Sequence, residues 1–94
     1  MFRDMAEVRQ ANADAGKHFF SSMMTHQYRS RVSGDLFGGR FFVTSEPDFW
    51  GNDRRYTVHT VKPDGSIWMV SNWRQFPTLK YAKYVARKLA KRDV

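Results

Sequence analysis

Residues 77–92 constrain the fold most strongly, because their apolar and basic side chains separate when the segment is drawn as an α-helix. At about 100° per residue, one arc of the helix collects the apolar residues Leu79, Ala82, Val85, Ala86, Leu89 and Ala90. The opposite arc collects Lys80, Lys83, Arg87, Lys88 and Lys91. Thr78 is a good N-cap residue after Pro77. We therefore predict a C-terminal helix that packs on a core through one face and presents a basic stripe on the other.

The length of 94 residues is that of one small domain, so we expect a single domain over residues 1–94. Aromatic residues make up 16% of the chain, enough for a core and for some aromatic side chains at a binding surface. The absence of cysteine excludes disulfides and thiolate metal sites. No apolar stretch has the length of a signal peptide or a membrane span, so we expect a cytoplasmic protein without membrane contact.

The formal net charge is +7, and the excess of positive charge lies in residues 54–94. Positive charge that is localised on a folded element favours a polyanionic partner. The alternative is that the basic stripe only keeps one helix face solvated. The charge pattern leaves both interpretations open.

The remaining segments predict an α+β fold. Residues 1–15 have the composition of a helix, and Gly16 is a suitable residue to end it. Strands are expected over residues 39–45, 54–61 and 67–73, with a possible fourth over residues 27–32. Residues 62–66 contain Pro, Asp and Gly and predict a tight hairpin turn. We expect an N-terminal helix, a three-stranded, possibly four-stranded, antiparallel meander and the basic amphipathic helix, with both helices on one face of the sheet.

The hairpin turn also predicts which residues share a face. With a loop at residues 63–65, one face collects Tyr56, Val58, Thr60, Trp68 and Val70, which we expect in the core. The other face collects Arg55, Thr57, His59, Val61, Ile67, Met69 and Trp73. Because this second set mixes basic and aromatic residues, it suits a surface that faces water or a ligand.

The residues that carry enzyme chemistry do not form a recognisable site. His18, His26 and His59 lack the close spacing of metal ligands. Pro47 and Asp48 are not followed by the second acidic residue and lysine that a metal-dependent nuclease needs, and Glu46 and Asp53 fit a hydrophilic loop. We therefore expect no catalytic residues, no metal and no cofactor, and a non-enzymatic protein.

The second half of the chain resembles a double-stranded-RNA-binding domain over roughly residues 40–92. In that family the last helix begins with a Lys-Lys-x-Ala-Lys pattern, and residues 79–83 match it at Lys80, Ala82 and Lys83, with Leu79 in place of the first lysine. The resemblance implies contacts between these lysines and phosphates across a groove. The family's Gly-Pro-x-His loop is absent from this chain.

Most of the chain is also similar to a family of short uncharacterised proteins of bacteriophages and mobile elements. The similarity lies in residues 18–21 (HFFS), 42–46 (FVTSE) and 54–58 (RRYTV), in the Asp64-Gly65 turn and in the late Ala-rich helix. It implies an accessory protein that acts by binding, located in the host cell cytoplasm if a phage encodes it.

Two functions follow as hypotheses. The first is nucleic-acid binding, to DNA or RNA, in which the phosphates contact Arg54, Arg55, Lys80, Lys83, Arg87, Lys88 and Lys91. In this hypothesis Trp73, or Trp68 if the register differs, stacks on a base. The second is an accessory factor that binds and inhibits or redirects a host or defence protein complex. There Phe49 and Trp50 in a polar loop act as the anchor, together with the sheet surface.

Overall fold

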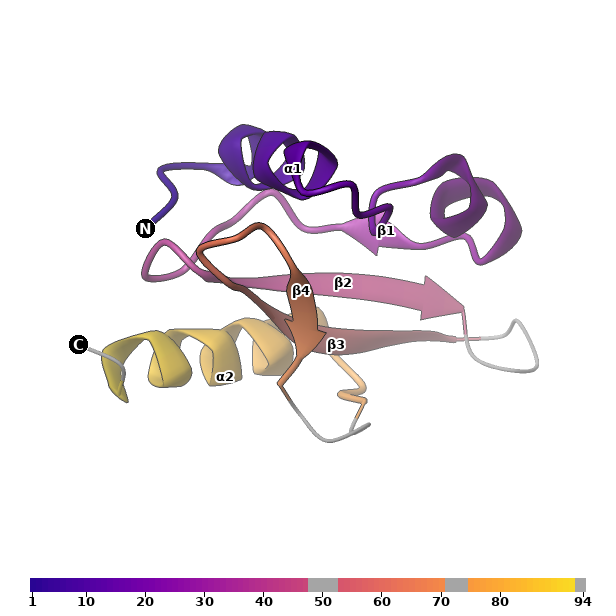
Figure 1. Cartoon of the computed structure of the whole chain (residues 1–94). Helices are drawn as coiled ribbons and strands as arrows, with labels where there is room; N and C mark the ends of the chain where they lie inside the picture. The colour runs from indigo at the N-terminus through magenta and orange to yellow at the C-terminus, as the bar shows by residue number, and fades with distance from the viewer. Residues whose placement is uncertain (48–52, 71–74, 93–94) are drawn as a thin grey trace.

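The computed structural model describes residues 1–47, 53–70 and 75–92. In these residues a four-stranded antiparallel sheet lies between two helices (Figure 1). The strands are β1 (Arg31–Val32), β2 (Phe41–Pro47), β3 (Arg54–Val61) and β4 (Ile67–Met69), and they pair in the order β1-β2-β3-β4. The helices are α1 (Met5–Asp14) and α2 (Leu79–Arg92), and one π-helical turn, η1 (Met23–Gln27), connects α1 to β1. The predicted α+β fold is confirmed. The possible fourth strand over residues 27–32 is present as β1, which covers only the last two of these residues.

Helix α1 is bounded by the residues that cap it. It begins four residues later than the composition predicts, because the Asp4 side chain accepts a hydrogen bond from the backbone N–H of Glu7 and so caps the helix there. At the other end Gly16 has a positive φ of 72°, and the backbone N–H groups of Gly16 and Lys17 donate to the carbonyls of Ala13 and Asn12. This pair of bonds is a Schellman motif, so the predicted stop at Gly16 is confirmed.

The hairpin between β3 and β4 has the predicted register. Thr60 pairs with Trp68 and Val61 pairs with Ile67, and the Lys62 N–H donates to the Ser66 carbonyl over 2.8 Å. Gly65 is required in the turn for two reasons. Its φ of 91° lies in the left-handed region, and a Cβ at this position would lie 2.3 Å from the carbonyl oxygen of Ala11.

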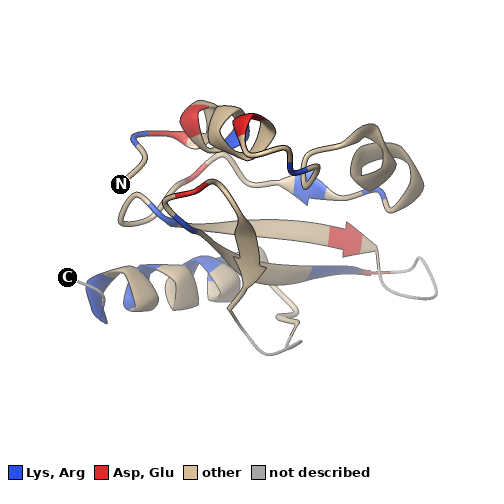
Figure 2. Cartoon of the chain, in the orientation of Figure 1, with Lys and Arg blue, Asp and Glu red and all other residues tan. Residues whose placement is uncertain are grey.

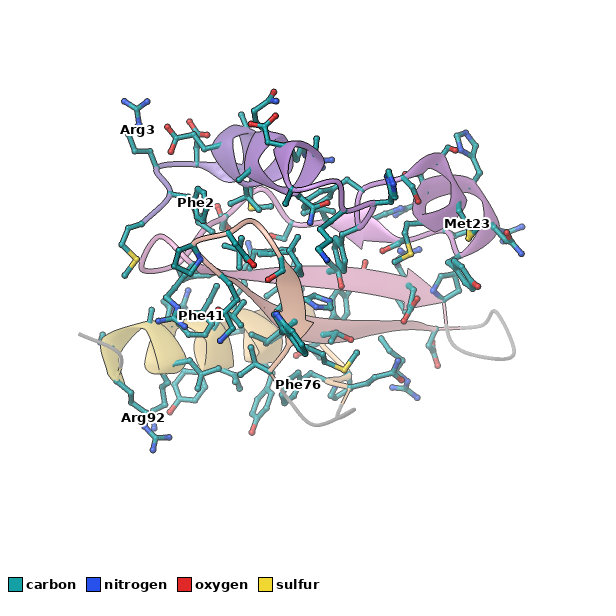
Figure 3. All side chains as sticks on the ribbon, viewed as in Figure 1. Phe2, Arg3, Met23, Phe41, Phe76 and Arg92 are labelled. Carbon is teal, nitrogen blue, oxygen red and sulfur yellow. The ribbon has the colours of Figure 1, made fainter. Side chains whose placement is uncertain are left out.

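The two helices pack against opposite faces of the sheet, which corrects the expectation that they share one face (Figure 1). On the α2 side, Phe41, Val43 and Val58 pack with Ala82 and Ala86, and Phe76 completes this cluster (Figure 3). On the α1 side, Phe42 and Val61 pack with Met5 and Val8. The physical reason lies in β2, whose consecutive residues Phe41, Phe42 and Val43 are all buried, so both of its faces need a cover.

Helix α2 begins and packs as its sequence predicts. Thr78 Oγ1 accepts a hydrogen bond from the Tyr81 backbone N–H over 3.2 Å, which confirms the predicted N-cap. Ala82 and Ala86 are fully buried against the sheet, and Val85, Leu89 and Ala90 are half-buried. Leu79, in the first turn, is more exposed than the other apolar residues of this arc.

Candidate nucleic-acid interface

The outer surface of α2 carries positive charge along its whole length. Residues 79–92 contain six basic residues and no Asp or Glu. Figure 2 shows the contrast with α1, where acidic residues are interspersed. Among these side chains the exposed ones are Lys80, Arg87, Lys88, Lys91 and Arg92. Arg92 lies at the far end of the helix (Figure 3).

Two of the predicted phosphate contacts have intramolecular partners on one side of α2. Lys83 Nζ lies 2.6 Å from a carboxylate oxygen of Asp35, in the segment that joins β1 to β2. The guanidinium of Arg87 lies 5.8 Å from the ring centroid of Phe37 in the same segment. Lys80, Lys88 and Lys91 have no carboxylate within ion-pair distance among the described residues. Lys83 is therefore paired with a carboxylate, whereas the charges of Lys80, Arg87, Lys88 and Lys91 are not neutralised by any carboxylate of the described residues.

The other side of α2 carries a ladder of aromatic rings. The Phe76 and Tyr81 ring centroids lie 5.3 Å apart, and those of Tyr81 and Tyr84 lie 6.2 Å apart. Lys88 Nζ lies over the Tyr84 ring, 5.2 Å from its centroid. Tyr81 and Tyr84 are 51% and 47% exposed. The rings border an open hollow of about 770 Å³ whose lining includes Lys88, Lys91 and Arg92.

Tyr81 and Tyr84 are not among the site residues predicted from the sequence. On the helix Tyr84 falls within the basic arc, between Lys91 and Lys88, and Tyr81 falls between Lys88 and Val85. A division into apolar and basic residues alone therefore leaves both tyrosines out. The available signal is their spacing, because Tyr81, Tyr84 and Lys88 are separated by three and then four residues and must lie on one stripe of a helix.

Trp68 lies on the same face of the sheet as α2. It pairs with Thr60 across β3 and β4, and it is 60% exposed. Its indole Nε1 donates to Ser66 Oγ over 3.2 Å, which holds the ring on the hairpin. The confirmed register therefore leaves Trp68 exposed, although its face was expected to be core. Trp73, and Phe49 and Trp50 of the alternative interface, lie outside the described residues.

The two neighbouring arginines of β3 lie on opposite faces of the sheet. Arg54 pairs with Pro47, on the α2 side, whereas Arg55 pairs with Glu46, on the α1 side. Arg54 can therefore act together with α2, and Arg55 is separated from α2 by the sheet. This placement removes Arg55 from the surface to which the sequence assigned it.

His59 is also on the α1 side, and it is buried rather than facing a ligand. Its ring stacks on Phe42 at 5.5 Å between centroids and meets the edge of Phe19 at 5.0 Å. Thr44 Oγ1 lies 2.9 Å from Nε2, within hydrogen-bond distance. Burial lowers the pKa of His59 to about 4, so the ring is neutral near pH 7. It is therefore a core residue, and the expected water- or ligand-facing surface around it is wrong.

The described parts of the chain contain neither a metal-binding cluster nor a membrane-spanning helix. Residues 1–47, 53–70 and 75–92 contain no group of three or more His, Asp or Glu side chains arranged to hold a metal ion. None of the helices in these ranges combines the length and hydrophobicity needed to cross a membrane.

Comparison with known protein families gives one match. Residues 4–87 match the model of a family described as a family of unknown function (DUF7447). No curated protein matches the chain, and no solved structure matches it.

Proposed function

Because the chain belongs to the family of unknown function DUF7447, we propose a function from its own residues: it is a non-enzymatic module that binds single-stranded nucleic acid through the outer surface of α2. The observation that supports this proposal is the combination of half-exposed Tyr81 and Tyr84 with unneutralised lysines on a helix that has no acidic residue.

The cations supply the sequence-independent part of the binding energy. Lys80, Lys88 and Lys91 project from one rigid element, so a strand that follows α2 contacts several of them at once. Each phosphate that they neutralise releases condensed counterions, and binding therefore weakens steeply as salt rises.

The exposed aromatic rings favour single strands over duplexes. Unpaired bases present their π-faces to Tyr81 and Tyr84, and stacking on an aromatic side chain is tolerant of sequence. Trp68 is a third exposed ring on the same side of the sheet. In a duplex the bases are already stacked on one another, so these rings would gain little.

The test is a salt titration with fluorescent oligothymidine and oligouridine, compared with duplex DNA and duplex RNA of equal length. We expect the single strands to bind more tightly and their affinity to fall steeply with salt. The resemblance of residues 79–83 to a double-stranded-RNA-binding domain makes duplex RNA the critical competitor. Tighter binding of a duplex, or affinity that does not change with salt, would contradict the proposal. The bacteriophage or mobile-element origin stays a prediction.

A matched pair of double variants locates the interface. Lys88→Gln with Lys91→Gln should weaken single-strand binding and flatten its salt dependence. Lys17→Gln with Lys62→Gln removes the same charge from exposed positions outside α2 and should have a much smaller effect. Lys83 is a poor choice for this test, because Lys83→Glu would place a carboxylate against Asp35. Equal losses in the two double variants would show that net charge, and not α2, governs binding.

A further inference from the structure

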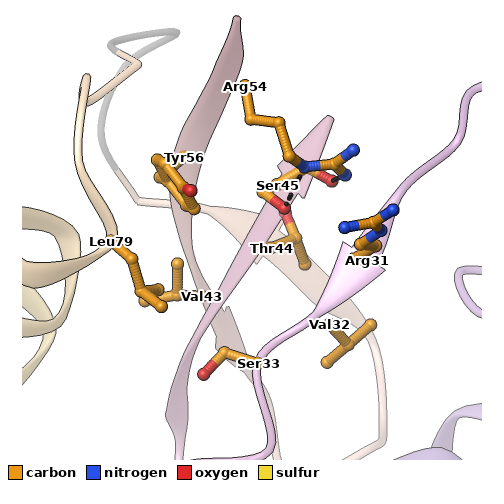
Figure 4. Close-up of a pocket in the computed structure, with 9 residues that line it drawn as sticks. All are labelled: Arg31, Val32, Ser33, Val43, Thr44, Ser45, Arg54, Tyr56 and Leu79. Carbon is orange, nitrogen blue, oxygen red and sulfur yellow. Dashed lines mark hydrogen bonds between the residues drawn. The ribbon is translucent and has the colours of Figure 1, made fainter. Parts of the chain in front are cut away.

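A pocket of about 240 Å³ opens on the α2 side of the sheet, where β1, β2 and β3 lie next to the start of α2 (Figure 4). Two arginines stand at one end of it, Arg31 from β1 and Arg54 from β3. Its other walls are apolar or carry hydroxyl groups, and they consist of Val32, Ser33, Val43, Thr44, Ser45, Tyr56 and Leu79. None of the described residues that line it is acidic.

Arg54 is held in place by neutral acceptors. Its Nε donates to Ser45 Oγ over 3.0 Å, and its Nη2 donates to the carbonyl oxygens of Ser45 and Arg29, each over 2.9 Å. A guanidinium has five N–H donors, and these bonds use three of them. The two N–H groups of Nη1 have no acceptor among the described residues. The side chain is therefore fixed while part of its hydrogen-bonding capacity and all of its charge remain available.

Arg31 brings a second positive charge to the same end of the pocket. It pairs with Ser45 across β1 and β2, so it lies on the same face as Arg54, which reaches across Ser45 toward it (Figure 4). Burial, and then the charge of Arg31, lower the pKa of Arg54. Glu46 offsets this in part, but it pairs with Arg55 on the opposite face of the sheet. Two guanidinium groups brought together in a partly desolvated position are unfavourable unless an anion joins them.

The backbone that supports this arrangement is strained. Arg29, whose carbonyl accepts from Arg54, has a φ of 52°, in the left-handed region that side chains other than Gly rarely adopt. Strained residues of this kind cluster at binding sites. Arg29, Arg31 and Arg54 also line an adjoining hollow of about 400 Å³. Asp53 is the single acidic residue among the described residues that line this hollow.

We propose that this arginine pocket, the site formed by Arg31, Arg54, Ser33 and Tyr56, binds a phosphate monoester. Arg31 and the Nη1 of Arg54 donate hydrogen bonds to the phosphate oxygens, and guanidinium groups match this geometry well. Tyr56, Val43 and Leu79 form the wall that contacts the attached organic group. The phosphate comes either from a free nucleotide or from the phosphorylated end of a nucleic-acid strand.

Calorimetric titration of the full chain with uridine 5′-monophosphate and with uridine tests the proposal. We expect the nucleotide to bind and the nucleoside to bind at least about tenfold more weakly, since charge-assisted hydrogen bonds are lost. Arg31→Gln and Arg54→Gln should each weaken nucleotide binding about tenfold or more. Arg55→Gln is the matched control, because it removes the same charge from the adjacent residue on the other face of the sheet. The Arg31 side chain makes no hydrogen bond to the described residues, so Arg31→Gln should leave the fold intact.

Any one of three results would overturn the proposal. The first is equal affinity for uridine and its monophosphate, and the second is no binding of the monophosphate at millimolar concentration. The third is an equal loss of affinity in Arg55→Gln and Arg54→Gln. Competition by an oligothymidine with a 5′-phosphate, but not by one with a 5′-hydroxyl, would identify a strand end as the source of the phosphate. Competition by neither oligothymidine, with nucleotide binding retained, would identify a free nucleotide. The double variant Lys88→Gln with Lys91→Gln should still bind the monophosphate, so failure of the α2 interface and failure of this pocket are distinguishable.

Discussion

The side chain of Asn12 links α1 to the turn between β3 and β4, because its Nδ2 donates to the carbonyl oxygen of Gly65 over 2.8 Å. Its Oδ1 accepts from the backbone N–H of Phe19 over 3.2 Å. Asn12 is only 2% exposed, and of its two hydrogen bonds the one to Gly65 is buried and the one from Phe19 is partly buried. One polar residue thereby links α1 to the segment that follows it and to a turn 53 positions away.

Asn12→Ala should destabilise the protein by about 3 kcal/mol, because it leaves a buried carbonyl and a partly buried N–H without partners. Urea unfolding monitored by circular dichroism measures the change. Gln10→Ala, on the exposed side of the same helix, is the control and should shift the unfolding free energy by no more than about 0.5 kcal/mol. An Asn12→Ala variant as stable as Gln10→Ala would show that the link contributes little.

Three Gly→Ala substitutions should give a graded series. Gly65→Ala should cost more than about 3 kcal/mol, because a positive φ and a contact of 2.3 Å with the Ala11 carbonyl oxygen oppose the new Cβ. Gly16→Ala has the positive φ but nothing within 4 Å of the new Cβ, and it should cost about 1 kcal/mol. Gly34→Ala has neither and should be close to neutral. Thermal unfolding ranks the three, and any other order would contradict this account of the turn.

The buried His59 should make the protein sensitive to acid. Burial lowers its pKa from 6.5 to about 4, so between these values the unfolded chain takes up a proton that the folded chain does not. Stability therefore falls as the pH decreases from about 6.5 to about 4, by at most about 3 kcal/mol from this residue, and the loss levels off at lower pH.

Urea midpoints at several pH values measure this dependence. His18→Gln, at an exposed position, should retain it, whereas His59→Gln should lose it. A nuclear magnetic resonance titration of the His59 ring in the unmodified protein gives the same answer without a substitution. A midpoint near pH 6.5 in that titration would contradict the buried, neutral histidine.

Tyr84→Ala should weaken single-strand binding about 5- to 150-fold, since stacking of one base on an aromatic ring contributes about 1–3 kcal/mol. Tyr28→Ala removes a ring of similar exposure, 50% against 47%, from the end of η1 and should leave affinity unchanged. Fluorescence anisotropy with labelled oligouridine compares the two. If both variants bind as the unmodified chain does, α2 contributes charge but no stacking.

Local signals in the sequence predicted the elements that are stabilised locally. Thr78, Gly16 and the turn at residues 62–66 act through hydrogen bonds to neighbours only a few residues away, and the structure confirms all three. The register of β3 and β4 followed from the turn, because a tight hairpin fixes the pairing of its strands.

The features that the sequence did not reveal depend on contacts between distant segments. Phe41, Phe42 and Val43 are buried on both faces of β2, whereas only one covered face was expected from the sequence. That expectation placed His59 and Arg55 on an open surface. The pairing of Lys83 with Asp35 joins residues that are 48 positions apart. The arginine pocket requires β1 to lie beside β2, and no local pattern places Arg31 next to Arg54.

The turn at Gly38 and Gly39 receives both described ends of the chain. The backbone N–H of Phe2 donates to the Gly39 carbonyl over 3.0 Å, and a Cβ at Gly38 would lie 2.7 Å from the Cβ of Ala90. A short linker would therefore close these residues into a backbone ring without bending the sheet. Cyclisation of this kind restricts the unfolded chain more than the folded one, so it should raise the melting temperature. The arginine pocket and the first turn of α2 lie away from that junction, and a cyclised protein would keep both open to ligand.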